Sequence, residues 1–223
     1  MSAPKAVILL SGGLDSATCL VMAQAQGFDC YALSLRYQQR HNIELEYARR
    51  FAKKYSAVHR EVLVDLSALG GSALTDEHIN VPEERGEGIP ITYVPARNTM
   101  LLTLAAAWAE VLDAQAIFIG VNAVDYSGYP DCRAEFIQQY QVLLKVGTKA
   151  GVEGHAPIIY APLLHLTKAD IIKTGIDLGL NYADTLSCYQ PDEQGKACGR
   201  CDSCYFRKQG FEQAGVSDPT VYQ

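Results

Sequence analysis

The chain has 223 residues, of which 48% are hydrophobic and 20% are charged, and its formal net charge is −6. This length suits one sizeable α/β core better than two full domains, and the acidic balance argues against a protein that holds DNA or tRNA tightly. The sequence offers neither a secretory leader nor an apolar run long enough to span a membrane, so we expect a cytoplasmic protein that acts on a small molecule, with no nucleic-acid partner.

Apolar runs typical of strands alternate along the chain with patterns typical of helices. Strands are expected at 6–10, 30–35, 61–64, 116–119 and 158–160, and helices at 15–26, 43–55, 99–112, from 134 onward and at 167–178. This alternation predicts a mostly parallel, Rossmann-like α/β sheet that is covered on both faces. Ligands bind such sheets beyond the carboxyl ends of the strands, where the loops at 11–16, 36–41, 94–98 and 120–132 should converge.

Two further segments have a distinctive composition. Residues 70–92 combine several glycines and prolines with many charges, which predicts a long loop or lid. The helix expected at 99–112 is apolar on every side, which is typical of a buried helix or of one at a subunit interface. This pattern permits a homodimer without requiring one.

The segment Ser11-Gly12-Gly13-Leu14-Asp15-Ser16 lies between an expected strand and an expected helix. Its glycines let backbone N–H groups turn toward one point, and the helix N-terminus adds a partial positive charge, so the segment predicts an anion site. Ser11 and Ser16 can donate hydrogen bonds to phosphate oxygens. The Asp15 carboxylate would repel a bare phosphate, so we expect a Mg²⁺ ion as its partner. The segment is not a Walker A loop, because no Gly-Lys-Ser/Thr follows.

Four of the seven cysteines crowd into the last part of the chain. Cys188, Cys198, Cys201 and Cys204 have the spacing C-x9-C-x2-C-x2-C, which is typical of metal ligation in a reducing compartment. Four thiolates make a closed, structural zinc site, but an iron–sulfur cluster accepts similar spacing. On spacing alone both metals remain open, with zinc favoured.

The phosphate segment resembles the PP-loop of the N-type ATP pyrophosphatases, which have an adenine nucleotide alpha hydrolase-like fold and transfer AMP from ATP to a substrate oxygen. Together with the terminal cysteines it closely resembles the 7-cyano-7-deazaguanine synthase family of queuosine precursor biosynthesis. The resemblance covers about residues 5–208 and includes Tyr37-Gln38-Gln39-Arg40-His41, Val94-Pro95-Ala96-Arg97-Asn98, Ser127-Gly128-Tyr129-Pro130-Asp131-Cys132-Arg133 and Thr167-Lys168-Ala169-Asp170. Two positions depart from it, because Gln38 and Ala96 stand where members usually carry glycine.

The resemblance implies an ATP-dependent C–N ligase. It would convert 7-carboxy-7-deazaguanine and ammonia into the nitrile 7-cyano-7-deazaguanine through an activated acid and an amide. It also implies one structural zinc ion per chain, with ATP and Mg²⁺ as co-substrate. The chain would then divide into a PP-loop ATP-binding α/β domain at 1–180 and a zinc-binding segment at 181–223 that packs on it.

The predicted site residues fall into four groups. ATP is expected at Leu9, Leu10, Ser11, Gly12, Gly13, Leu14, Asp15 and Ser16, catalysis at Asp15, Lys168 and Arg97, and the metal at the four cysteines. Substrate binding is expected at Asp125, Tyr129, Asp131 and Arg133. A carboxylate there can accept both the N–H and the NH₂ of a guanine-like edge, an aromatic ring can stack on the flat base, and an arginine can hold a carboxylate or phosphate.

Two rival interpretations stay open. A PP-loop tRNA sulfurtransferase would need a reactive cysteine, which Cys132 could supply, or an iron–sulfur cluster at Cys188–Cys204, together with a basic surface for tRNA. A zinc-ribbon interaction module on an inert scaffold would not be an enzyme at all. The acidic charge opposes the first rival, and the intact phosphate segment opposes the second.

Overall fold

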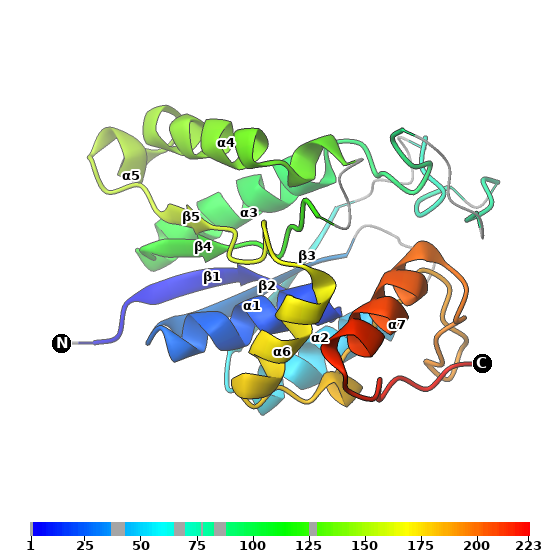
Figure 1. Cartoon of the computed structure of the whole chain (residues 1–223). Helices are drawn as coiled ribbons and strands as arrows, with labels where there is room; N and C mark the ends of the chain where they lie inside the picture. Colours follow the sequence, from blue (N-terminus) through cyan, green and yellow to red (C-terminus); the bar gives the residue numbers. More distant parts are fainter. Residues whose placement is uncertain (1, 37–42, 65–69, 77, 83–87, 125–128) are drawn as a thin grey trace.

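A computed structural model describes residues 2–36, 43–64, 70–76, 78–82, 88–124 and 129–223 of the chain. Within them, strands and helices alternate in one α/β arrangement (Figure 1). The strands are β1 (Lys5–Leu9), β2 (Asp29–Arg36), β3 (Val58–Leu63), β4 (Ala116–Phe118) and β5 (Ile158–Tyr160). The helices are α1 (Leu14–Ala25), α2 (Ile43–Lys54), α3 (Arg97–Leu112), α4 (Ala134–Gly147), α5 (Lys149–Val152), α6 (Lys168–Asp177) and α7 (Asp202–Ala214), with short 3-10 turns η2 (Pro130–Cys132) and η3 (Tyr182–Asp184).

The five strands form one sheet in the order β3-β2-β1-β4-β5, and every neighbouring pair is parallel. After β3 the chain crosses back over the sheet through α3 and adds β4 on the other side of β1. The strand order therefore reverses between β1 and β4, and a ligand is expected beyond the carboxyl ends of these two strands. The predicted parallel, Rossmann-like fold is confirmed.

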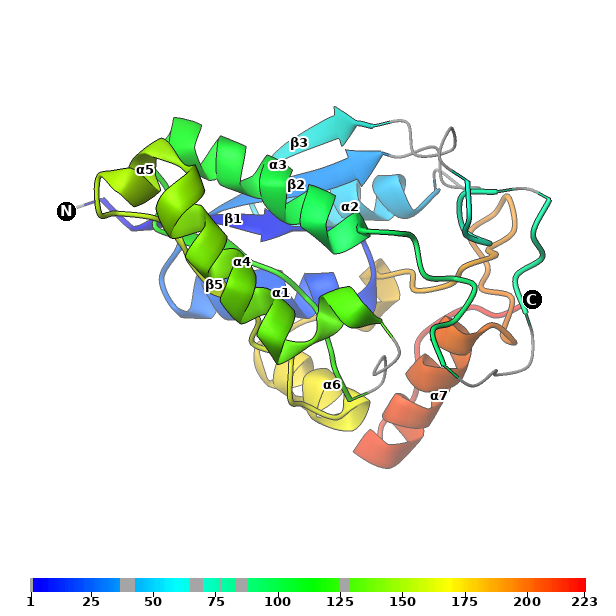
Figure 2. The ribbon, with the colours of Figure 1, turned by 90° about the horizontal axis from the view of Figure 1, so that it is seen from above.

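Helices cover both faces of the sheet, so two separate apolar cores form. One core joins alternate residues of the central strands, such as Ala6, Ile8 and Phe118, to α1, α2, α6 and α7. The other joins the intervening residues Val7 and Ile117 to α3 and α4. Figure 1 shows the first group of helices below the sheet, and Figure 2 shows α3 and α4 lying across its other face. The period-two alternation within one buried strand places its side chains in both cores.

The expected elements match the structure apart from their boundaries and one exposure pattern. β3 begins at Val58, three residues before the expected start, because its first residues are not an apolar run. α3 is not buried on every side: Leu102 and Ala105 face the core, whereas Thr103 and Val111 are exposed. The expected loop at 70–92 consists of turns and irregular chain in its described parts.

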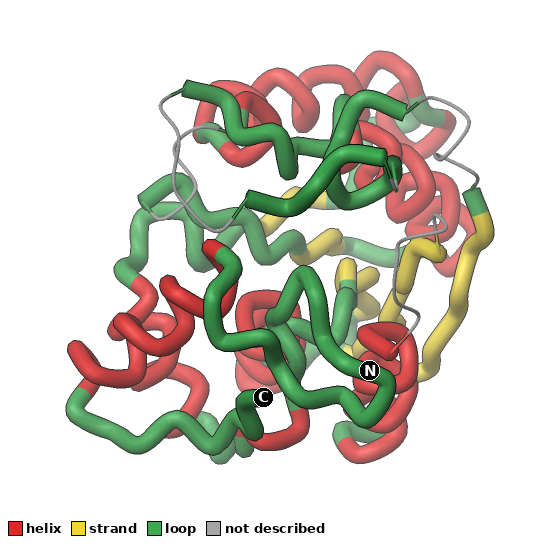
Figure 3. The backbone as a smooth tube through the Cα atoms, turned by 90° about the vertical axis from the view of Figure 1, so that its right-hand side faces the viewer, coloured by secondary structure: helices red, strands yellow, loops and turns green. Residues whose placement is uncertain are grey.

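Loops gather at the carboxyl ends of the strands, the end that faces the viewer in Figure 3. The chain from Leu186 through the cysteines to the start of α7 also lies there, because Leu186 hydrogen-bonds to Gly12 and Ser203 of α7 lines the same cavity as the phosphate loop. α7 packs on α6 and on the first core through the buried residue Phe211. The sequence-distant C-terminal part therefore closes the end of the sheet where a ligand is expected.

Candidate active site and metal centre

The phosphate loop connects the end of β1 to α1 and is held by its own hydrogen bonds. Gly13 is the N-cap of α1, and the Ser16 hydroxyl donates to the Gly13 carbonyl at 3.1 Å. The Ser16 oxygen also accepts the Ser11 N–H at 3.1 Å and lies 3.0 Å from the Ser11 oxygen. These contacts fix a tight turn whose backbone N–H groups stay at the helix N-terminus, where a phosphate is stabilised.

Close backbone contacts on both sides require glycine. Gly12 has a φ of 87°, and a Cβ there would lie 2.5 Å from the Glu44 carbonyl oxygen at the start of α2. Gly120 follows β4, and a Cβ there would meet the backbone of Asp15 and Ser16 at 3.2 Å. Glycine at these two positions brings α2 and the end of β4 against the phosphate loop.

A cavity of about 240 Å³ opens at this loop, at the point where the strand order reverses. Seven of the eight residues predicted to bind ATP line it, namely Leu9, Leu10, Ser11, Gly13, Leu14, Asp15 and Ser16. Apolar side chains at the ends of β2, β4 and α3 extend the wall, and Arg97 and Tyr129 from the predicted catalytic and substrate groups also line it. An anion-binding turn beside an apolar wall suits a nucleotide with its phosphates at the loop.

Asp15 and Lys168 form an ion pair at the edge of this cavity. The Lys168 ammonium lies 2.8 Å and 3.0 Å from the two carboxylate oxygens of Asp15, and only 6% of Lys168 is exposed. Lys168 is the first residue of α6, whose N-cap Thr167 makes a capping box with Asp170. The capping box fixes the helix start, and thereby the direction in which the lysine side chain leaves it. The structure thus brings together two of the three predicted catalytic residues.

The predicted substrate-binding residues are not all at the cavity. The Tyr129 hydroxyl is 2.8 Å from the Thr92 hydroxyl, and its ring is part of the wall. Asp131 is buried and accepts the Asn98 N–H at 3.0 Å, so it caps the start of α3. Arg133 is exposed at the N-cap of α4. Asp125 lies outside the described residues. Ligand contacts of these four residues stay predictions.

Cys132 is poorly suited to the reactive role that a sulfurtransferase would need. It is buried, and burial, reinforced by the charge of Asp131, raises the pKa of its thiol to about 12. Its sulfur accepts a hydrogen bond from the Asn98 side chain at 3.4 Å. The nucleophilic form of cysteine is the thiolate, so a thiol that stays protonated at neutral pH is unreactive.

The four terminal cysteines converge on one point. The sulfur atoms of Cys188, Cys198, Cys201 and Cys204 all lie within 4.8 Å of one another, which fits four thiolates around a single ion. Backbone N–H groups point at the sulfurs: Cys198 N donates to the Cys188 sulfur at 3.1 Å, and Cys201 N donates to the Cys198 sulfur at 3.4 Å. The thiols of Cys188 and Cys204 hydrogen-bond to Cys201 and lower its pKa. The cluster could therefore hold a metal ion.

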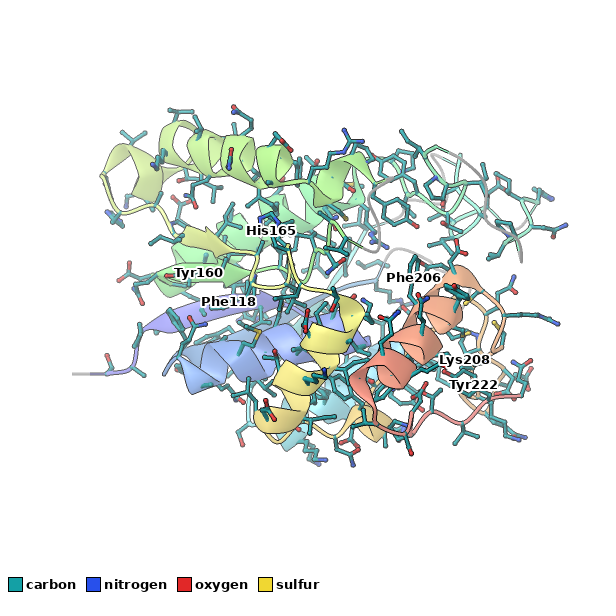
Figure 4. All side chains as sticks on the ribbon, viewed as in Figure 1. Phe118, Tyr160, His165, Phe206, Lys208 and Tyr222 are labelled. Atoms are coloured by element: carbon teal, nitrogen blue, oxygen red, sulfur yellow. The ribbon has the colours of Figure 1, made fainter. Side chains whose placement is uncertain are left out.

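Further contacts tie α7 and the chain end around this cluster. The buried Arg207 guanidinium binds Asp218 at 3.1 Å and the carbonyl of Tyr182 at 3.0 Å. Lys208 donates to the Gly199 carbonyl, and its ammonium lies 4.2 Å from the centre of the Tyr222 ring. Figure 4 labels Lys208 and Tyr222 beside each other near the end of the chain. On the far side of the molecule, the labelled rings of Phe118 and Tyr160 stack across neighbouring strands (Figure 4).

Several polar residues that line the cavity were not predicted as site residues, and Glu44 and Ser187 are two of them. Glu44 lines it from the first turn of α2, and burial raises the pKa of its carboxyl to about 7, although the positive charge of Arg97 acts in the opposite direction. Ser187 lines it as well, directly before Cys188 of the cysteine cluster. In the sequence, a glutamate at the start of a charged helix or a serine beside a cysteine does not indicate a nucleotide site. Only the fold brings these residues to residues 11–16.

Comparison with known proteins shows the family of the chain. The family model described as "Queuosine biosynthesis protein QueC" matches residues 5–215. The chain belongs to the QueC family. Relatives named 7-cyano-7-deazaguanine synthase include that of Methylobacillus flagellatus, 61% identical over 98% of this chain and 96% of the relative. The Nitrosococcus oceani relative is 60% identical, and the Pseudomonas aeruginosa PAO1 relative is 59% identical, each over the full length of both chains. The predicted family is thus confirmed, and the sulfurtransferase alternative is not favoured.

More distant solved structures agree on the fold. NMN synthetase from Francisella tularensis aligns with a TM-score of 0.51 at 16% identity, covering 96% of this chain and 79% of the other. A 4-thiouridine synthetase solved with RNA and bound ATP also aligns with a TM-score of 0.51, at 18% identity, covering 98% of this chain and 47% of the other. Within the described part of the chain, no helix is both long enough and apolar enough to cross a membrane.

Proposed function

We propose that this chain is a 7-cyano-7-deazaguanine synthase that converts 7-carboxy-7-deazaguanine, ammonia and ATP into the nitrile. The membership of the QueC family supports this reaction. The observation that carries it is the cavity itself, where a phosphate loop, the Asp15–Lys168 pair, Arg97 and an aromatic wall meet. A polyphosphate and a flat, carboxylated base require these kinds of group together.

The chemistry explains why ATP is needed. A carboxylate oxygen is a poor leaving group, so the substrate oxygen attacks the α-phosphorus of ATP and pyrophosphate leaves. Ammonia then displaces AMP and gives the amide. The amide oxygen then attacks the α-phosphorus of a second ATP and becomes adenylated in the same way. Loss of AMP and a proton leaves the nitrile. Both oxygens of the acid therefore depart on AMP.

The residues of the cavity divide this work by charge. The backbone N–H groups of residues 11–16 hold the phosphates, as at other helix N-termini. Arg97 and Lys168 supply positive charge where negative charge develops on the transferring phosphate. Mg²⁺ bound with ATP would neutralise further phosphate charge, with Asp15 as its ligand. Tyr129 offers a ring for the base, and Asp125, Asp131 and Arg133 are retained as candidates for its polar edge.

For the cysteine cluster we propose one structural zinc ion per chain. Four thiolates leave no open position for water, so zinc there would supply a cross-link between 188 and 204 and no catalysis. In this arrangement residues 1–180 form the ATP-binding domain, and 181–223 form a metal-bearing segment packed on it. A cytoplasmic location, a homodimer and the absence of a nucleic-acid partner are part of the same proposal, supported by the acidic charge and by the exposed apolar residues of α3 and α4.

An isotope experiment tests the reaction. The enzyme is given 7-carboxy-7-deazaguanine labelled with ¹⁸O in both carboxylate oxygens, together with ammonia, ATP and Mg²⁺, and the products are analysed by mass spectrometry. We expect unlabelled nitrile and two AMP molecules per nitrile, each carrying one ¹⁸O, and labelled amide when ATP is limiting. If labelled inorganic phosphate and ADP appear instead, the substrate oxygen is activated by phosphorylation and not by adenylation. An untouched acid with ATP use that rises on adding tRNA would refute the proposed substrate.

A further inference from the structure

The metal-bearing segment is hydrogen-bonded directly to the phosphate loop. The Leu186 N–H donates to the Gly12 carbonyl at 3.0 Å, and the next residue, Ser187, accepts the Leu14 N–H on its hydroxyl oxygen at 2.9 Å. Both Leu186 and Ser187 line the cavity. The Ser187 hydroxyl therefore lies at the N-terminus of α1, among the groups that receive phosphates.

The hydrogen bonds of the loop show which hydroxyl group is free to donate. Ser16 has one hydroxyl hydrogen, and it is used on the Gly13 carbonyl. At the 3.0 Å contact between the two loop hydroxyls, Ser11 must then be the donor, so its hydrogen is used on Ser16. Ser187 differs: its oxygen accepts from Leu14, and no acceptor for its own hydrogen is found among the described residues. A hydroxyl that already accepts an N–H is also polarised toward donation.

The position of Ser187 is fixed from both sides by the metal centre. Its carbonyl accepts a short hydrogen bond from the hydroxyl of Ser203, which lies between two metal ligands in the first turn of α7. The following residue is Cys188, whose sulfur accepts N–H groups from Gln190 and Cys198. A metal ion held by the four sulfurs would thus hold Ser187 against the phosphate loop.

We propose that Ser187 is a phosphate-binding residue of the ATP site, supplied by the metal-bearing segment. Its hydroxyl takes the Leu14 N–H and offers its own hydrogen to an oxygen of the β- or γ-phosphate, the part that leaves as pyrophosphate. This assignment rests on the proposed use of the cavity for ATP. The cysteine cluster would then affect the reaction, because it fixes the position of the Ser187 hydroxyl that contacts ATP.

Pyrophosphate provides the test, because it carries only the part of ATP that Ser187 is assigned to hold. In the metal-loaded Ser187→Ala variant the inhibition constant for inorganic pyrophosphate and the KM for ATP should each rise roughly 10- to 100-fold, the usual effect of losing a hydrogen bond to a charged group. The inhibition constant for AMP should stay within about twofold, since AMP lacks those phosphates. Ser217→Ala, on an exposed serine of the same segment, is the matched control and should change neither constant.

Two further measurements keep the outcomes distinct. Metal content and Tm are measured for each variant, and Ser203→Ala, which loosens Ser187 without removing its hydroxyl, should raise the pyrophosphate constant a few-fold. Unchanged constants for pyrophosphate in Ser187→Ala, or equal losses for AMP and pyrophosphate, would overturn the assignment. If Ser187→Ala cannot be obtained with its metal, an unchanged pyrophosphate constant in Ser203→Ala overturns it instead. Failure of the wild-type enzyme to bind ATP or pyrophosphate at all would refute the proposed function rather than this residue.

Discussion

Gly210 is the point where α7 presses on the lysine of the candidate active site, and Gly210→Ala should disturb both stability and turnover. A Cβ at this glycine would lie 2.3 Å from Cγ and 2.8 Å from Cβ of Lys168, and 3.0 Å from the Ile172 side chain. Carbon atoms pack at about 3.5 to 4.0 Å, so α7 or the lysine must move by roughly 1 Å or more. Movement of Lys168 by that amount would lengthen its 2.8 Å contact with Asp15.

The expected cost can be worked out from three contributions. Overpacking of a core costs about 1 to 3 kcal/mol, and weakening a largely buried ion pair adds about 1 kcal/mol or more. Alanine in a helix interior offsets about 1 kcal/mol of this. The net loss is therefore about 2 kcal/mol, which for a chain of this length lowers Tm by roughly 4 to 8 °C. Turnover should fall more than tenfold if Lys168 acts on the phosphates.

The assay compares this change with Gly147→Ala. Gly147 ends α4 and is exposed, and a Cβ there would meet only the Leu143 side chain at an ordinary 3.6 Å. This control should keep wild-type turnover and be as stable as wild type or slightly more so. Thermal unfolding of the metal-loaded proteins and the rate of nitrile formation are measured for both. Wild-type stability and turnover in Gly210→Ala would show that α6 and α7 can separate at no cost, and the reasoning would be wrong.

Three other changes are predicted. Ala96 has a left-handed φ of 54°, so Ala96→Gly should raise the free energy of unfolding by about 0.5 to 1 kcal/mol in denaturant titration, whereas Ala107→Gly in exposed α3 should lower it by about as much. Burial raises the pKa of Asp218, but the Arg207 charge and nearby hydrogen bonds lower it by more, so the net pKa is lowered. The stability this carboxylate supplies is present above its unfolded pKa near 4 and is lost as pH falls through the folded pKa; Asp218→Asn should therefore be destabilised at pH 7 and approach wild type in strong acid. Cys201→Ser should lose the metal and the fold together, and elemental analysis of the wild type should find zinc near one per chain; stoichiometric iron would contradict the zinc assignment.

The sequence predicted those parts of the molecule that depend on local pattern. The alternation of apolar runs is enough to predict the parallel sheet, and the glycines and serines of residues 11–16 are enough to predict an anion site at its switch point. The spacing of the four cysteines predicted their convergence, because three of them lie within one turn and a helix start. The QueC resemblance rested on these same segments.

Other parts depend on contacts between distant segments, which no local pattern reveals. Ser187 lies at the phosphate loop, and its carbonyl is bound by Ser203 of α7, a helix that packs on α6. Glu44 reaches the cavity because Gly12 lets α2 approach. Asp131 has the carboxylate expected of a base-binding residue, yet in the structure it caps α3. The left-handed Ala96 shows why that position favours glycine, a reason that the sequence alone did not supply.

The hydrogen bond from the Leu14 N–H to the Ser187 hydroxyl joins residues that are 173 positions apart. During translation the anion-binding turn is made first, and at about 5 to 20 residues per second the residues that complete it follow on the order of 10 to 30 s later. Over that interval the growing chain carries β1 and the first helix without the serine and the cysteines that close the site. If Ser187 contacts the phosphates as proposed, complete nucleotide binding is expected only after residues 187–204 have left the ribosome and the proposed metal ion has bound.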